Sequence, residues 1–206
     1  GFHPHLSNVA GVVVAAASIL LIVGVLVRSS SVVRRHYACQ RCAENLNRVY
    51  QAVGLYSDDY DGFLPAVARA EGARWHAIGG RGPQSGSNTK NPYLLLGLRY
   101  TDRPADFLCG GRTRHGAPPL TLAEVARRSD FPSRDHITYS YRLMPSTQVR
   151  MEALAGRPLM ADMNPHFEGS VAESAAAQPF RLDEMVRRLN SPNHGRQGQN
   201  VLSGDG

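Results

Sequence analysis

The N-terminal part of the chain contains a stretch of nineteen residues without a charge, VAGVVVAAASILLIVGVLV at residues 9–27. In a helix that rises ~1.5 Å per residue, such a stretch spans roughly the ~30 Å hydrocarbon core of a lipid bilayer. The sequence after Arg28 is too polar to enter lipid. Residues 1–28 are therefore predicted to form one transmembrane helix. The chain is expected to work at a membrane surface or in an assembly built on this helix.

The helical pattern continues beyond the apolar stretch without a breaker. No proline occurs between Pro4 and Pro65, and apolar residues recur at alternating spacings of three and four, as in a helix with one apolar face. We predict one nearly continuous helix over residues 8–57, roughly 75 Å long at ~1.5 Å per residue, with 29–58 as its amphipathic continuation. The sequence DDYDG at 58–62 is expected to end it. The apolar face consists of Val32, Cys39, Cys42, Leu46, Val49, Val53 and Tyr56.

Residues 59–206 are predicted to form one α+β globular domain with long loops, because the chain after the helix is long enough to bury a core. The alternation of apolar and polar residues in HITYSYRLM at 136–144 predicts a half-buried strand. The implied architecture is a long helix lying on a small antiparallel sheet. Further strands are expected at 158–163 and 199–202, and short helices at 93–98, 121–128 and 180–189.

The charge pattern argues against nucleic-acid binding. The net charge is +6 and all but one of the 23 basic residues are arginines, but they are scattered and form no basic stripe with interleaved aromatic residues. Sequence signatures of hydrolases and phosphate-binding loops (G-x-S-x-G, H-E-x-x-H) do not occur. The sequence therefore offers no motif that points to an enzyme, and membrane lipid is an expected partner. Several arginines follow the apolar stretch, where they would face anionic headgroups: Arg28, Arg34, Arg35 and Arg41.

The three cysteines, Cys39, Cys42 and Cys109, form no recognised haem or metal motif. Cys39 and Cys42 make a C-x-x-C pair, but Ala43 follows in place of the histidine of a c-type haem attachment motif. A zinc site would need a second pair, and only Cys109 remains. The expected outcome is buried thiols or one disulfide from Cys39 or Cys42 to Cys109. No cofactor is predicted.

An acidic cluster at the predicted helix end is a weak metal candidate. Asp58, Asp59 and Asp61, with Gly62, resemble part of a calcium loop, in which oxygen ligands surround a glycine turn. They lack the alternating spacing and the closing glutamate of a complete loop. A helix stop with solvated carboxylates is therefore favoured over calcium binding.

His194 and Asn200 lie in a glycine-rich segment before a predicted strand. A catalytic histidine needs a nucleophile and an orienting acid within hydrogen-bond reach, and the segment supports that role by composition alone. The favoured interpretation is that both side chains hold the loop by hydrogen bonds.

Five sequence motifs follow one another along most of the chain. They are the apolar helix with its arginine-rich continuation and CAENLNRVYQAVGLYSDDYDGFLP (42–65), then FLCGG (107–111), ITYSYRLM (137–144), PLMADMNP (158–165) and SPNHGRQGQNVLSGDG (191–206). Together they resemble the type II secretion pseudopilins, and most closely a large bacterial group of pseudopilin-like proteins with prepilin-type N-termini. In the last and most specific motif the matching residues are His194, Gly198, Asn200 and Asp205.

This resemblance implies a pilin-like fold, a structural, non-enzymatic role and anchorage in the bacterial inner membrane. Counting positive charges beside the anchor would place the domain in the cytoplasm. Pseudopilins carry arginines at the same place and still export the domain, so the resemblance implies a periplasmic or extracellular domain. Export in turn makes a disulfide between Cys42 and Cys109 the expected pairing.

The N-terminus departs from the pseudopilin pattern. GFHPHL resembles a modified family start, where a peptidase cuts between glycine and phenylalanine, but Gly1 is retained and Leu6 replaces the glutamate that serves filament docking. Three hypotheses follow. The first is a structural subunit that forms filaments, and the second is a single-pass accessory subunit of a larger membrane complex that has lost prepilin processing. The third is an anchored enzyme or metal-binding module that uses C-x-x-C or His194. For the first two, protein partners would bind the N-terminal helix, where small residues permit close approach. The assembly residues are expected to be Phe2, Gly11, Ala15, Ser18 and Ile22.

Overall fold

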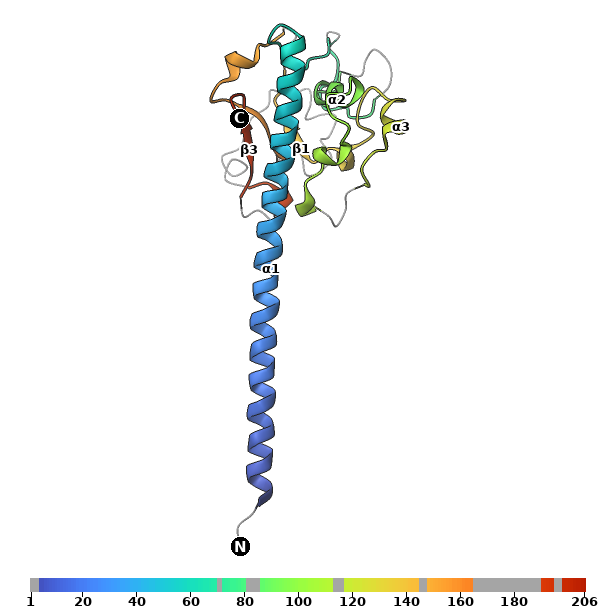
Figure 1. Ribbon diagram of the computed structural model, residues 1–206. Helices are drawn as coiled ribbons and strands as arrows, with labels where there is room; N and C mark the ends of the chain where they lie inside the picture. The colour runs from blue at the N-terminus through green and yellow to red at the C-terminus, as the bar shows by residue number, and fades with distance from the viewer. Residues whose placement is uncertain are drawn as a thin grey trace. The chain divides into compact units, whose positions relative to one another are not determined.

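The computed structural model confirms the long N-terminal helix, α1 (Pro4–Asp59), which Figure 1 shows as the longest element. The chain divides into two compact units, Gly1–Tyr37 and Ala38–Gly206, and α1 contributes to both. Phe2 and the helix expected at 180–189 lie outside the described residues. The structure describes residues 4–69, 72–80, 86–112, 117–144, 148–164, 190–194 and 198–206.

In the first unit, α1 exposes its apolar side chains. Every residue from Val9 to Val27 whose side chain is described is exposed. The hydroxyl groups in and after this segment bond within the helix, as when Ser18 donates to the Val14 carbonyl and Ser29 to the Val25 carbonyl, both at 2.8 Å. Such internal bonding leaves these hydroxyls without any need for water.

In the second unit, the same helix buries one face. Cys42, Val49 and Val53 are almost fully buried, whereas Val32, predicted to belong to this face, is 60% exposed. Cys39 is half-buried. The apolar face that packs on the domain therefore begins at Cys42.

The helix ends as the DDYDG sequence predicts. Asp61 and Gly62 have φ angles of 50° and 82°, in the left-handed region that glycine adopts without strain. The Gly62 N–H donates to the Ser57 carbonyl at 2.8 Å, which satisfies a carbonyl of the last helical turn. The chain then turns away from α1 towards Leu64, which is buried.

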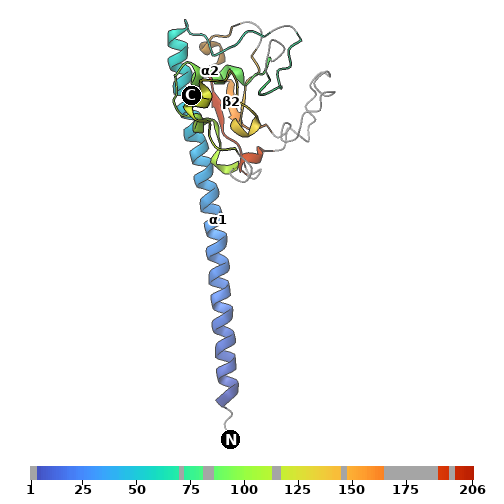
Figure 2. The same ribbon diagram turned by 90° about the vertical axis from the view of Figure 1, so that its right-hand side faces the viewer.

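The small antiparallel sheet is confirmed and has the order β1-β2-β3. Its strands are β1 (Tyr139–Tyr141), β2 (Pro158–Asp162) and β3 (Val201–Ser203), and β2 is labelled in Figure 2. Tyr139 pairs with Asp162, and Met160 pairs with Leu202. The strand predicted around β1 is shorter than expected, because the Thr138 N–H donates to the Phe107 carbonyl rather than to a strand.

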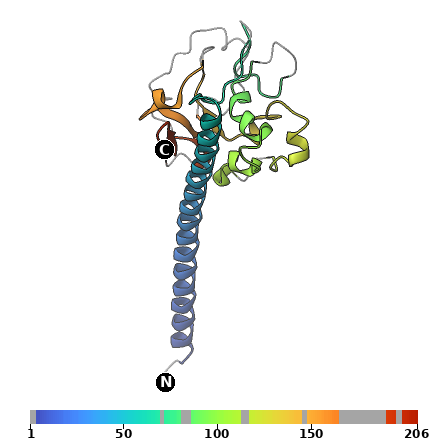
Figure 3. The same ribbon diagram turned by 45° about the horizontal axis from the view of Figure 1, so that its top comes forward.

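Two short α-helices also lie in the described part of the domain. Figure 3 shows them on the opposite side of the C-terminal part of α1 from β2 (orange) and β3 (red). The expected helix near 93–98 is α2 (Lys90–Gly97), which buries Tyr93 against Phe131 with ring centroids 5.0 Å apart. The helix predicted at 121–128 is only one turn, α3 (Leu122–Val125), closed by a Thr121–Glu124 capping box. The 3₁₀ helices among the described residues are η1 (Pro104–Phe107), η2 (Gly110–Arg112), η3 (Arg134–His136), η4 (Met151–Leu154) and η6 (Pro192–His194).

Candidate functional site

Four buried side chains from four separate segments converge between the C-terminal part of α1 and the sheet. They are Cys42 on α1, Cys109 before η2, Asp162 at the end of β2 and His194 on η6. One potential ligand atom from each lies within 4.8 Å of all the others. The Asp162 and His194 side chains are 0% and 6% exposed. We call this group the buried cluster.

The sulfur atoms of Cys42 and Cys109 form a disulfide across 67 positions of sequence, with Cα atoms 5.1 Å apart. The residues alone had left Cys39 and Cys42 as alternatives, and the pseudopilin resemblance implied Cys42. Three residues along an α-helix correspond to a rotation of about 300°, so Cys39 points about 60° away from Cys42. Cys39 remains a free thiol, with its Sγ 3.7 Å from Oδ1 of Asn200.

His194 contacts both the carboxylate and the disulfide. Its Nε2 lies 3.0 Å from Oδ2 of Asp162 and 3.7 Å from Sγ of Cys109. Asp162 also accepts hydrogen bonds from the Asn200 backbone N–H at 2.6 Å and from the Asn193 side chain at 3.2 Å. These donors satisfy a carboxylate that burial would otherwise make costly.

Asn200 connects this network to the helix. Its amide nitrogen lies 3.3 Å from both the Cys39 carbonyl oxygen and Nε2 of His194. The two other residues of the C-terminal motif do not belong to the buried cluster. Gly198 is half-buried and precedes β3, and Asp205 is exposed and follows β3. The hydrogen bonds of His194 and Asn200 hold the C-terminal segment against α1 and β2.

The sequence reasoning missed Asp162 and Asn193 as members of this site. The available signal was an acidic residue at the end of an apolar strand, PLMAD, where a carboxylate needs a partner if it is buried. Nothing in the local sequence identifies that partner, since His194 lies 32 positions further on.

Gly111 allows the FLCGG turn to approach η6 closely. A Cβ atom at this position would clash with the Asn193 carbonyl oxygen and lie 3.0 Å from Nδ1 of His194. Gly111→Ala is therefore expected to lower the free energy of unfolding by about 1–3 kcal/mol, the usual cost of overpacking. Gly110→Ala is the matched control, because a Cβ there meets nothing within 4 Å. Urea denaturation of the two variants in detergent measures the difference, and equal effects would contradict the role of Gly111.

The acidic residues at the helix end do not gather around a common point in the described part of the chain. Asp59 accepts a hydrogen bond from the Tyr100 hydroxyl at 2.7 Å, and this bond raises the pKa of Tyr100 to about 12. The Asp61 backbone carbonyl accepts from Arg150 at 2.7 Å. Asp58 is exposed. These contacts fit the helix stop better than a calcium loop.

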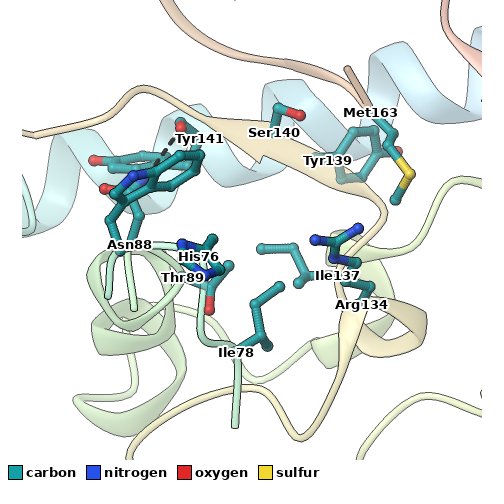
Figure 4. A pocket seen from close by; sticks show the side chains of 11 residues that line it. His76, Ile78, Asn88, Thr89, Arg134, Ile137, Tyr139, Ser140, Tyr141 and Met163 are labelled. Atoms are coloured by element: carbon teal, nitrogen blue, oxygen red, sulfur yellow. Dashed lines mark hydrogen bonds between the residues drawn. The ribbon is translucent and has the colours of Figure 1, made fainter. Parts of the chain in front are cut away.

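A separate cavity of about 100 Å³ lies beside β1 (Figure 4). Tyr139 and Tyr141 line it from the strand, and burial raises the pKa of both phenols. Figure 4 shows Asn88 and Thr89 on the side opposite Ile137, and the dashed line marks the bond from Asn88 to the Tyr141 carbonyl at 2.9 Å. Ligand sites for drug-sized molecules measure roughly 300–1,000 Å³, so this cavity suits only a very small molecule or water.

The remaining predicted site residues lie on the apolar segment of α1. Gly11, Ala15, Ser18 and Ile22 are exposed, and a Cβ at Gly11 would meet nothing within 4 Å. Among the described residues, one helix is long and apolar enough to cross a membrane, and it contains this segment.

No protein-family model, curated protein or solved structure matches the chain.

Proposed function

We propose that this protein is a membrane-anchored, non-enzymatic structural subunit of pseudopilin type that assembles through its N-terminal helix. The observation that carries the proposal is the apolar segment of α1, in which every described side chain from Val9 to Val27 is exposed. Exposed apolar surface of this extent is strongly unfavourable in water. This apolar surface would be stable in contact with lipid or with the transmembrane helices of other subunits.

The segment offers a face suited to helix–helix contact. At about 100° per residue, Gly11, Ala15, Ser18 and Ile22 fall within about 60° of one another around the helix axis. Small residues on one face allow backbones to approach closely in a membrane. The hydroxyl of Ser18 already bonds within its own helix, so it adds no unpaired donor to such a contact.

The C-terminal unit fits a pilin-like domain placed outside the cytoplasm. Its helix lies on a three-stranded antiparallel sheet, as the resemblance leads one to expect. The Cys42–Cys109 disulfide supports a periplasmic or extracellular position, because disulfides persist in oxidising compartments. The bacterial inner membrane is the proposed location of the anchor.

A second candidate is a single-pass accessory subunit of a larger membrane complex. It is favoured by Leu6, which stands where pseudopilins carry the glutamate used for filament docking. The two candidates share the anchor and differ in what binds to it. They therefore make different predictions about the composition of the assembly.

Cross-linking in native membranes tests the proposal. Gly11→Leu combined with Ala15→Leu should lower the cross-linked fraction roughly tenfold, the effect of losing about 1.4 kcal/mol of helix–helix interaction. Gly24→Leu combined with Ala17→Leu is the matched control, because both positions point about 100° or more away from every residue of that face. It should leave cross-linking unchanged.

The composition of the cross-linked product separates the two candidates. Homopolymers support the filament subunit, and a fixed ratio to an unrelated membrane complex supports the accessory subunit. Recovery of the wild-type chain only as a monomer, with no helix–helix product, would overturn both.

A further inference from the structure

We propose that the dithiol form of this protein binds one Zn²⁺ ion through Cys42, Cys109, Asp162 and His194, the four residues of the buried cluster. The inference goes beyond the proposed structural role and does not depend on it. It rests on the convergence of the four side chains, the bonds that orient them and the negative charge that the deprotonated ligands would carry there.

The ligand set is one that zinc prefers. Zinc binds cysteine sulfur, histidine nitrogen and carboxylate oxygen in a tetrahedral arrangement, with bonds of roughly 2.0–2.3 Å. Such bonds place the ligand atoms roughly 3.3–3.8 Å apart. In the protein these atoms already lie within 4.8 Å of one another, and His194 Nε2 is 3.7 Å from the Cys109 sulfur. Shifts of about 1 Å would therefore complete the tetrahedron.

The two ligands other than cysteine are already positioned by neighbouring side chains. Asn193 donates to Asp162 from its side chain, Asn200 donates from both its backbone N–H and its side chain, and the Asn200 amide also contacts Nε2 of His194. Outer hydrogen bonds of this kind orient metal ligands and typically change metal affinity by about 10–100-fold when they are lost. The site would therefore require little rearrangement of Asp162 on binding an ion.

Zinc binding would remove the protons of the two thiols, and the resulting ligands would need positive charge beside them. Two thiolates and the Asp162 carboxylate would place three negative charges among side chains that are nearly fully buried. Burial of unpaired charge is very costly, and a divalent cation cancels most of it. A site of four protein ligands with little solvent exposure is of the closed, structural kind.

The cluster also has a route to solvent. Cys109 lines a surface depression of about 360 Å³ together with Arg41, Arg48 and Arg103. The depression gives a small reductant and a hydrated ion access to this side of the disulfide.

The exchange between disulfide and metal site is chemically balanced. A dithiol reductant transfers two electrons and two protons, so that the Cys42–Cys109 bond breaks, two thiols form and the reductant becomes a disulfide. Zinc then displaces the two thiol protons, which leave to solvent, and binds the thiolates. Oxidation by a disulfide reverses the sequence and releases the ion. The same two sulfur atoms thus serve either the disulfide or the metal, never both.

Metal titration of the full-length chain in detergent tests the proposal. The protein is reduced with dithiothreitol, desalted without oxygen and titrated with Co²⁺ as an optical probe, then with Zn²⁺. We expect one Co²⁺ per chain, with the absorption of tetrahedral thiolate coordination, displacement by Zn²⁺, and release on reoxidation. The oxidised protein should bind none. Reduced protein that binds no metal, or equal binding before and after reduction, would overturn the proposal.

Ligand variants assign the site. His194→Gln and Asp162→Asn should each weaken binding at least ~10-fold. Cys39→Ser is the matched thiol control, because Cys39 lies outside the four-residue set, and it should bind as the wild type does. Unchanged affinity in both ligand variants, or loss of binding in the Cys39 variant alone, would refute the assignment.

Circular dichroism covers the case in which reduction or substitution unfolds the chain. If the reduced wild type loses structure, Zn²⁺ should restore it, since metal binding and folding are then coupled. Reduced protein that stays unfolded with Zn²⁺ present would also overturn the proposal.

Discussion

Replacing both Cys42 and Cys109 with serine is expected to lower the free energy of unfolding by about 4 kcal/mol. The disulfide closes a loop across 67 positions, and loop-closure entropy of an unfolded chain cross-linked at that separation corresponds to about 4 kcal/mol. Both cysteines are almost fully buried, so the serine hydroxyls would add an unfavourable polar contribution. Chemical denaturation of the full chain in detergent, with a chelator present, measures the change.

Cys39→Ser provides the matched control for this prediction. Cys39 is half-buried and forms no disulfide, so its replacement should change the free energy of unfolding by less than about 1 kcal/mol. A double variant within 1 kcal/mol of the wild type would mean that the Cys42–Cys109 bond does not stabilise the domain.

Placing arginine at both Val14 and Leu21 is expected to release the chain from the membrane. Arginine near the centre of a transmembrane helix costs about 2.5–3.5 kcal/mol on insertion scales, so two substitutions together cost about 5–7 kcal/mol. Both residues are exposed on the apolar segment of α1, so the change does not disturb packing within the chain. Alkaline extraction of membranes, followed by quantification of the pellet and the supernatant, measures the release.

Val32→Arg combined with Val33→Arg is the control. These residues are also exposed and apolar but lie beyond residue 27, beside Arg34. The control should stay in the pellet, because arginine at the headgroup level meets anionic lipid. Equal retention of the two double variants would argue against residues 9–27 as the anchor.

The long helix and the positions of the strands were predictable because their signals are local. The absence of proline and the three-and-four spacing mark a helix in any context, and α1 extends over Pro4–Asp59. The alternation in HITYSYRLM located β1, and the strand candidates PLMADM (158–163) and QNVL (199–202) located β2 and β3. The spacing of apolar residues and the local composition were enough to predict these elements, because each of them buries one face against the same core.

The lengths of the shorter elements depended on long-range contacts. The pattern at 121–128 predicted a longer helix than the single turn α3 that the structure has, in which Thr121 and Glu124 cap the N-terminus. The predicted strand loses its first residues because Thr138 bonds to Phe107 from another part of the chain. A local pattern contains no information about such competing partners, which is why the ends of these elements were wrong.

By itself, the sequence determined that this chain has an apolar N-terminal helix, an amphipathic continuation and a small α+β domain. For the cysteines it left two outcomes, buried thiols or one disulfide from Cys39 or Cys42 to Cys109. Only the tertiary structure decided the rest: it paired Cys42 with Cys109 and brought Asp162 and His194 to them. The physical reason is that the helix rotates Cys39 away from the core. Residues up to 152 positions apart meet only when β2, η6 and α1 pack together.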